Sequence, residues 1–103
     1  MISLALIGCG EVAESGHLPT ILNHDRFRLA AVCDVDAARA QLLANRAGGV
    51  PVYTDWRELL AREQELDGVV LALPPEVSPD VAIEALRNNL AVLDEKPLAA
   101  TVA

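Results

Sequence analysis

A short apolar segment near the amino terminus leads directly into closely spaced glycines. Residues 2–7 read Ile-Ser-Leu-Ala-Leu-Ile, and Gly8, Gly10 and Ala13 then follow in the spacing G-x-G-x-x-A. In a strand-turn-helix unit the first glycine permits a tight turn, the second lets the backbone approach a pyrophosphate, and the small third residue lets the helix pack on the strand. N–H groups at the helix start then face the phosphates. The predicted phosphate-binding residues are Gly8, Gly10, Glu11, Val12 and Ala13.

A carboxylate follows the second apolar segment at the spacing expected of a ribose-binding acid. Residues 29–33 end in Asp34, about 20 residues beyond Ala13. A carboxylate there accepts hydrogen bonds from the ribose hydroxyls and repels a 2′-phosphate, which favours NAD over NADP. Helix capping is the alternative role for Asp34, although Asp36 is better placed for it. Arg39 leaves NADP open, since an arginine there can stack on adenine or reach a phosphate, but we expect its side chain to be solvated.

Composition points to one α/β domain that binds a small molecule. Of the 103 residues, 52% are hydrophobic and only 3% aromatic, with the apolar content carried by Ala, Val, Leu and Ile. Buried parallel strands have this composition. Fifteen acidic against eight basic residues give a net charge of −7. That charge repels nucleic acid and anionic membrane surfaces, so neither is an expected partner.

The sequence further predicts a cytoplasmic protein without a metal site. No apolar run approaches the ~18 residues of a membrane-spanning helix, and Met1 leads directly into a predicted strand rather than a signal peptide. Cys9 and Cys33 should lie near the ends of adjacent strands, yet we expect both to stay reduced in the cytosol. No CxxC pair is present, and His17 and His24 lack the spacing of metal ligands.

Strands and helices are predicted to alternate along the chain without a linker or a repeat. Asp36, Asp55 and Ser78 are the predicted N-caps of three helices, of which the first ends at Gly48-Gly49 and the last at Asn88-Asn89. Pro19 should kink or split the helix that follows the glycine turn. The predicted strands are residues 2–7, 29–33, 51–53, 69–73 and 91–94.

This alternation predicts a doubly wound parallel sheet, a Rossmann fold, with the strand order 3-2-1-4-5. Ligands of such sheets bind at the carboxyl ends of the strands, where strands 1 and 4 diverge. Three segments should therefore face one crevice, although they lie far apart in the sequence. They are the glycine turn, Pro74-Pro75 after the fourth strand, and Glu95-Lys96 after the fifth. We add Leu73, Pro74, Glu95 and Lys96 to the candidate cofactor-binding residues.

Over its whole length the chain resembles the Gfo/Idh/MocA oxidoreductases, a family that includes glucose-fructose oxidoreductase and inositol dehydrogenase. The resemblance rests on residues 8–13, 17–19, 31–36 and 67–70, and above all on Glu95-Lys96-Pro97-Leu98-Ala99. It implies the NAD(P)-binding domain of an enzyme that transfers a hydride between nicotinamide and a sugar, cyclitol or related polyol. It also implies a catalytic role for Lys96, whose ammonium group would hold the substrate oxygen or help to move its proton.

Members of this family continue into a second α/β domain, which supplies most substrate contacts and the usual oligomer interface. Residues 1–103 correspond to about the first third of such an enzyme and are expected to form one Rossmann domain without the second domain. We expect this chain alone to bind cofactor without turnover. Self-association is expected as well, because apolar surface that the second domain would cover is exposed.

Two other functions are compatible with the same fold. A non-catalytic module could report NAD(H) occupancy to a partner protein. An S-adenosylmethionine-dependent methyltransferase also places a glycine-rich turn after its first strand and an acid after its second. The segment Glu95-Lys96-Pro97 and the small residue Ala13 argue against the methyltransferase.

Overall fold

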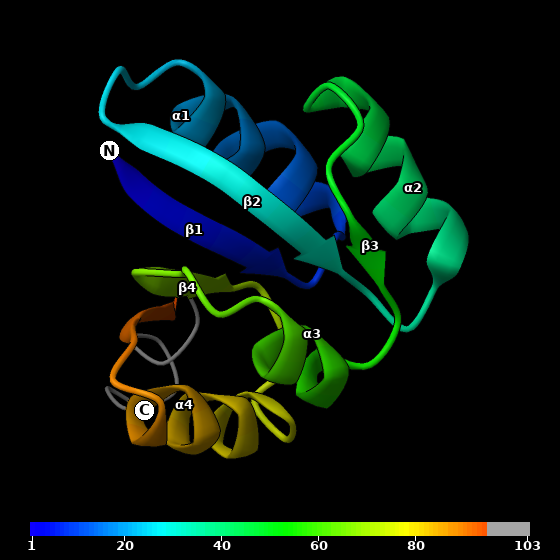
Figure 1. The fold of residues 1–103 in the computed structure, drawn as a ribbon. Helices are drawn as coiled ribbons and strands as arrows, with labels where there is room; N and C mark the ends of the chain where they lie inside the picture. Colours follow the sequence, from blue (N-terminus) through cyan, green and yellow to red (C-terminus); the bar gives the residue numbers. More distant parts are fainter. Residues whose placement is uncertain (95–103) are drawn as a thin grey trace.

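A computed structural model of the protein describes residues 1–94, so the predicted site residues Glu95 and Lys96 lie outside the described residues. Five parallel strands form one sheet in the order β3-β2-β1-β4-β5, which confirms the predicted Rossmann topology (Figure 1). The strands are β1 (Ile2–Ile7), β2 (Phe27–Cys33), β3 (Val52–Tyr53), β4 (Gly68–Leu71) and β5 (Ala91–Asp94).

Helices cover both faces of this sheet. The helical segments are η1 (Ala13–His17), α1 (Leu18–Leu22), α2 (Ala37–Arg46), α3 (Trp56–Arg62) and α4 (Ser78–Arg87). Figure 1 shows α1 and α2 on one face and α3 and α4 on the other. The chain moves outward from β1 through β2 to β3, then crosses to β4 and moves outward in the opposite direction. The reversal between β1 and β4 creates the switch point where ligands of this fold bind.

The central strands are apolar throughout because helices bury both faces of the sheet. Along β1, Leu4 and Leu6 pack with the core of the α1 and α2 side, whereas Ala5 and Ile7 pack with that of the α3 and α4 side. Successive side chains of a strand point to opposite faces, so a central strand covered on both sides must be apolar throughout. Leu6 and Ile7 are accordingly buried at the end of β1 that leads into the glycine turn.

The predicted helix boundaries are mostly confirmed. The Asp36 carboxylate accepts hydrogen bonds from two backbone N–H groups in the first turn of α2, and Asp55 accepts one in α3. Gly48-Gly49 follows the end of α2, and Asn89 adopts a φ of 61° after α4. Asparagine tolerates this left-handed conformation better than most residues.

The break at Pro19 is also confirmed. The segment Ala13–His17 is π-helical, and the N–H of Leu18 bonds to the carbonyl of Ala13 before a regular α-helix begins. Because proline has no N–H, it cannot donate to the carbonyl of Ser15, and the helix changes type just before it.

The predicted N-cap at Ser78 is wrong. Val77 occupies the N-cap position, Ser78 is the first residue of α4, and Pro79 is the second. The Ser78 side chain is buried, and its hydroxyl donates to the carboxylate of Asp94 at the end of β5. A charged acceptor forms a stronger hydrogen bond than a backbone group does. The hydroxyl therefore ties the start of α4 to the end of β5 instead of capping the helix.

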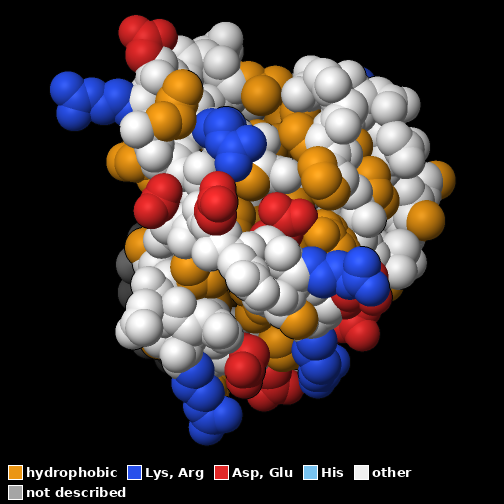
Figure 2. Space-filling model, in the orientation of Figure 1, with side chains coloured by type: hydrophobic (Ala, Val, Ile, Leu, Met, Phe, Trp, Pro, Cys, Tyr) orange, Lys and Arg blue, Asp and Glu red, His pale blue; other side chains and the backbone are white. Residues whose placement is uncertain are grey.

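The surface carries charges of both signs. On the face shown in Figure 2, Arg side chains stand among Asp and Glu side chains and form no continuous basic area. No helix within residues 1–94 is both long and apolar enough to cross a membrane.

Candidate cofactor-binding site

Gly8 forms the tight turn that ends β1. Its φ is +99°, and its N–H donates to the carbonyl of Cys33 at 2.8 Å. A Cβ atom at this position would lie 2.3 Å from the carbonyl oxygen of Ala72. Only glycine therefore allows the turn to lie against the backbone that follows β4.

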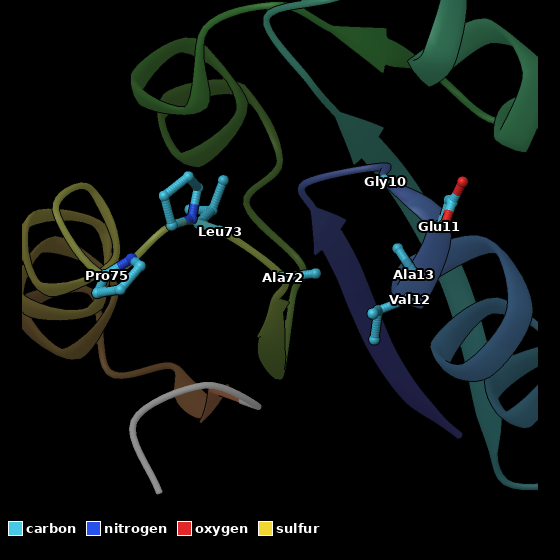
Figure 3. A pocket seen from close by; sticks show the side chains of 8 residues that line it. Gly10, Glu11, Val12, Ala13, Ala72, Leu73 and Pro75 are labelled. Atoms are coloured by element: carbon cyan, nitrogen blue, oxygen red, sulfur yellow. The ribbon is translucent and has the colours of Figure 1, made fainter. Parts of the chain in front are cut away.

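Gly10 faces open space on the other side of this turn. Apart from Gly10 and its two neighbours in the chain, no atom of the described residues lies within 4 Å of a Cβ built on it. Gly10 also lines an open pocket of about 350 Å³ between the glycine turn and the segment after β4 (Figure 3). The pocket is lined by Gly10, Glu11, Val12, Ala13, Ala72, Leu73, Pro74 and Pro75. The structure thus brings together two of the three segments that the topology predicts at one crevice.

The wall of the pocket opposite the turn arises because β4 ends early. The fourth strand was predicted to reach Leu73, but it ends at Leu71. The N–H of Ala72 still donates to the carbonyl of Ile7, the last residue of β1, at 2.9 Å. Since β1 turns away at Gly8, the chain beyond Ala72 has no strand on that side with which to pair. Pro75 lines the pocket as predicted from the topology, whereas Ala72 was not among the predicted site residues, although it directly precedes Leu73.

A helix start provides donors on the turn side of the pocket. The N–H of Glu14 donates to the carbonyl of Gly10 at 3.0 Å, as in the first turn of a helix. The N–H groups of residues 11–13 precede that bond, and such groups have no acceptor within their own helix. Ala13 is completely buried in the core under the turn, which confirms its packing role. This arrangement suits an anionic group at the rim of the pocket.

Asp34 holds the backbone of the turn. One carboxylate oxygen accepts the N–H of Cys9 at 2.7 Å, and the other accepts the N–H of Asp36 at 2.8 Å. Asp36 itself caps α2, so the alternative in which Asp34 is the helix cap is wrong. Each carboxylate oxygen can accept a second hydrogen bond. Binding of ribose by Asp34 stays a prediction.

Arg39 is not solvated as predicted. Its Nε donates to the carbonyl of Cys9 at 2.9 Å, and its terminal nitrogen pairs with Glu14 at 2.8 Å. Arg46 pairs with the second carboxylate oxygen of Glu14 at 2.6 Å. The hydrogen bond from Arg39 and the two nearby positive charges lower the pKa of Glu14, so this group is ionised at neutral pH.

The sequence-based prediction missed Glu14. Arg39 and Arg46 are seven residues apart on a predicted helix, which places them on one face. That spacing was the available signal, but it did not identify the acid between them, because Glu14 belongs to a helix on the other side of β2 in the sequence.

The two cysteines next to the turn are free and buried. Burial is the main cause that raises the pKa of Cys9 and of Cys33 to about 12, with the Asp34 charge adding to it. We therefore expect both thiols to resist a disulfide reagent at pH 8 in the folded chain and to react rapidly in denaturant. Rapid reaction of the native chain, followed at 412 nm, would contradict this burial.

The same shift predicts a loss of stability at alkaline pH. In the unfolded chain the thiols ionise near their ordinary value of 9.0, whereas in the fold they stay protonated up to about 12. The unfolded state therefore releases protons first, and the free energy of unfolding should fall between pH 9 and 12. Denaturation series compared with a Cys9→Ala, Cys33→Ala variant check this, since the variant should lose part of that pH dependence.

No group of three or more potential metal ligands occurs among residues 1–94. The chemistry of the pocket is instead that of backbone donors, a carboxylate and an apolar wall.

Comparison with known proteins agrees with this geometry. The model of the Gfo/Idh/MocA family, an oxidoreductase family with an NAD-binding Rossmann fold, matches residues 2–103. The chain belongs to the Gfo/Idh/MocA oxidoreductase family.

Individual members of the family support the assignment. The chain is 33% identical to inositol 2-dehydrogenase of Salmonella typhimurium over 104 residues, a match that covers 99% of this chain and 30% of that protein. It therefore spans about a third of the length of this relative.

Two solved structures contain related domains. The WlbA dehydrogenase of Bordetella pertussis, in complex with NADH and UDP-GlcNAcA, superposes with a TM-score of 0.84 at 32% identity over 93% of this chain and 29% of that one. A 3-ketoreductase of Actinomadura kijaniata, in complex with NADP and TDP-benzene, gives a TM-score of 0.83 at 32% identity over 94% and 29%. These comparisons favour the oxidoreductase over the sensing module and the methyltransferase.

Proposed function

We propose that this chain is the cofactor-binding domain of an NAD(P)-dependent oxidoreductase that transfers a hydride between nicotinamide and a sugar, cyclitol or related polyol. The pocket between the glycine turn and residues 72–75 carries this proposal, because it lies at the switch point of the sheet. The related inositol 2-dehydrogenase supports the substrate class. The bound nicotinamide would supply the hydride chemistry, and the residues of the chain bind and orient it.

Each described residue has a separate role in this proposal. Gly10 leaves room for the pyrophosphate, and the N–H groups of Glu11, Val12 and Ala13 donate to it. Asp34 accepts hydrogen bonds from the adenosine ribose while it holds the Cys9 N–H. Leu73 and Pro74 form the apolar wall that restricts the cofactor from the side of β4.

We propose Lys96 as the catalytic residue and Glu95, which precedes it in the sequence, as a cofactor-binding residue. Lys96 follows Asp94, the last residue of β5, by two positions in the sequence. Because β5 pairs in parallel with β4, both strands end at the edge of the sheet where the pocket opens. An ammonium group there would hold the substrate oxygen and stabilise the charge that develops on it.

The proposal also covers the arrangement of the whole enzyme, its self-association and its location in the cell. Residues 1–103 would act as one cofactor-binding domain, with a second domain of the enzyme providing the substrate contacts. The exposed side chain of Leu93 and an apolar hollow of about 230 Å³ beside it support self-association. A cytoplasmic location is also part of the proposal, and there the buried thiols of Cys9 and Cys33 would stay reduced.

Titration calorimetry of the chain with NADH, NADPH and S-adenosylmethionine tests the cofactor assignment. We expect NADH to bind and Asp34→Ala to weaken that binding by about tenfold or more, since hydrogen bonds to a charged group contribute about 1.5–3 kcal/mol. Asp36→Ala is the matched control: it removes a carboxylate two residues away and should cost about 1 kcal/mol of stability as a lost helix cap, with little effect on NADH affinity. Tighter binding of S-adenosylmethionine than of NADH, or equal effects of the two variants, would contradict the assignment.

A further inference from the structure

Glu14 lies between two arginines beside the predicted ribose site. Its two carboxylate oxygens pair with different partners, Arg39 at 2.8 Å and Arg46 at 2.6 Å. The Glu14 side chain is only 24% exposed. Both arginines come from α2, whereas Glu14 comes from η1, so the pairing joins the two helices that flank the carboxyl ends of β1 and β2.

Arg39 and Asp34 are held on the backbone of the same residue. Asp34 accepts the N–H of Cys9 at 2.7 Å, and Arg39 donates to the carbonyl of Cys9 at 2.9 Å. A ribose bound to the Asp34 carboxylate would therefore lie next to the Arg39 guanidinium. Arg39 therefore supplies a cation close to any group attached at the 2′ position.

The charges of this cluster cancel. Asp34 and Glu14 contribute two negative charges, and Arg39 and Arg46 contribute two positive ones. A 2′-phosphate brings about two further negative charges, which need a cation with unused donors. Glu14 accepts a hydrogen bond from one terminal nitrogen of Arg39 and compensates its positive charge, so less of that charge is available to a phosphate.

We propose that Glu14 is a specificity-determining residue that favours NAD over NADP by engaging Arg39. The proposal rests on the proposed function, because it assumes that the adenosine ribose binds at Asp34. Glu14 is placed neither on the cofactor nor on the substrate, and it acts through Arg39. Removal of its charge should leave Arg39 fixed on the Cys9 carbonyl with its positive charge no longer compensated by Glu14.

The test compares NADH and NADPH titrations of the full chain in its wild-type form and as Glu14→Gln. Glutamine keeps the length of the side chain and removes the charge. We expect Glu14→Gln to raise NADPH affinity by about two- to fivefold at low salt, in line with the modest strength of partly exposed charge pairs, and to leave NADH affinity within about twofold. The gain should shrink as salt is added.

Two further variants separate specificity from a structural effect. The Glu14→Gln, Arg39→Gln double variant should lose the gain in NADPH affinity, because no cation remains at Cys9. Arg46→Gln removes one ion pair of the same cluster but keeps the pair between Glu14 and Arg39, so it should not raise NADPH affinity. A thermal melt of each variant shows whether it is folded.

The outcomes distinguish this inference from the function on which it rests. If the wild-type chain binds NADH and Glu14→Gln leaves the ratio of the two affinities unchanged, or lowers both equally, the inference is overturned and the proposed function stands. If the wild-type chain binds neither cofactor, the proposed function fails and the inference fails with it. A change of the ratio toward NADPH that requires Arg39 supports both.

Discussion

A single methyl group added at Gly8 is expected to destabilise the fold by about 3 kcal/mol or more, because it combines a left-handed backbone with an overpacked contact. The φ of +99° disfavours any residue with a Cβ, and that atom would lie 2.3 Å from the carbonyl oxygen of Ala72. Total stabilities of single domains are about 5–15 kcal/mol, so this loss is a large part of the whole. Urea denaturation of Gly8→Ala, followed by circular dichroism, measures it.

Gly16→Ala is the matched control for this prediction. Gly16 lies within η1 and has no positive φ, and outside its own helical segment no atom of the described residues lies within 4 Å of a built Cβ. Alanine should be tolerated there and should stabilise the helical segment by about 0.5–1 kcal/mol. If Gly8→Ala proved as stable as Gly16→Ala, the turn would not require glycine and its contact with Ala72 would be in error.

The second large effect is expected for Gly10→Ala, which should weaken NADH binding and leave the folding of the domain nearly unchanged. Its Cβ position is open, so Gly10→Ala should fold with nearly the stability of the wild type. The new methyl group would be added to a residue that lines the pocket, where we propose that the pyrophosphate approaches the backbone. Overpacking costs about 1–3 kcal/mol, which corresponds to a loss of NADH affinity of at least about fivefold.

Calorimetry with NADH checks this effect, and Gly16→Ala again provides the control, since it adds the same group away from the pocket. The control should bind NADH like the wild type. Unchanged affinity in Gly10→Ala, with its fold intact, would show that the cofactor does not approach this side of the turn.

Features fixed by neighbouring residues were predictable from the sequence. The strand order followed from the alternation of apolar segments with helices, and the turn followed from the spacing of Gly8, Gly10 and Ala13. The caps at Asp36 and Asp55 act on N–H groups two or three residues away. Such signals are local, and no later packing displaced them.

The wrong predictions concern side chains whose partners are distant in the sequence. Ser78 bonds to Asp94, which is 16 residues away, and Arg39 bonds to Glu14, which is 25 residues away. Both residue types have an ordinary local role, as a helix cap or as a solvated cation, and the local role was the one predicted. In the fold a charged partner lies within reach, and the stronger hydrogen bond forms instead.

The early end of β4 is likewise caused by a residue that is distant in the sequence. Residues 69–73 are uniformly apolar or small, so the pattern alone extends the strand to Leu73. The strand ends at Leu71 because its neighbour β1 turns away at Gly8. The length of a strand thus depends on a residue more than 60 positions earlier, and this dependence creates the wall of the pocket.

The most direct test of the account is an amide chemical-shift titration of the isotope-labelled chain with NADH. We predict that the largest changes fall on the amides of Gly10 to Ala13 and of Ala72 and Leu73, which line the pocket from both sides. The amides of Trp56 and Asn88, which line a different hollow between α3 and α4, should not move. Changes confined to that second hollow, or no change at saturating NADH, would contradict the assignment of the glycine turn as the cofactor site.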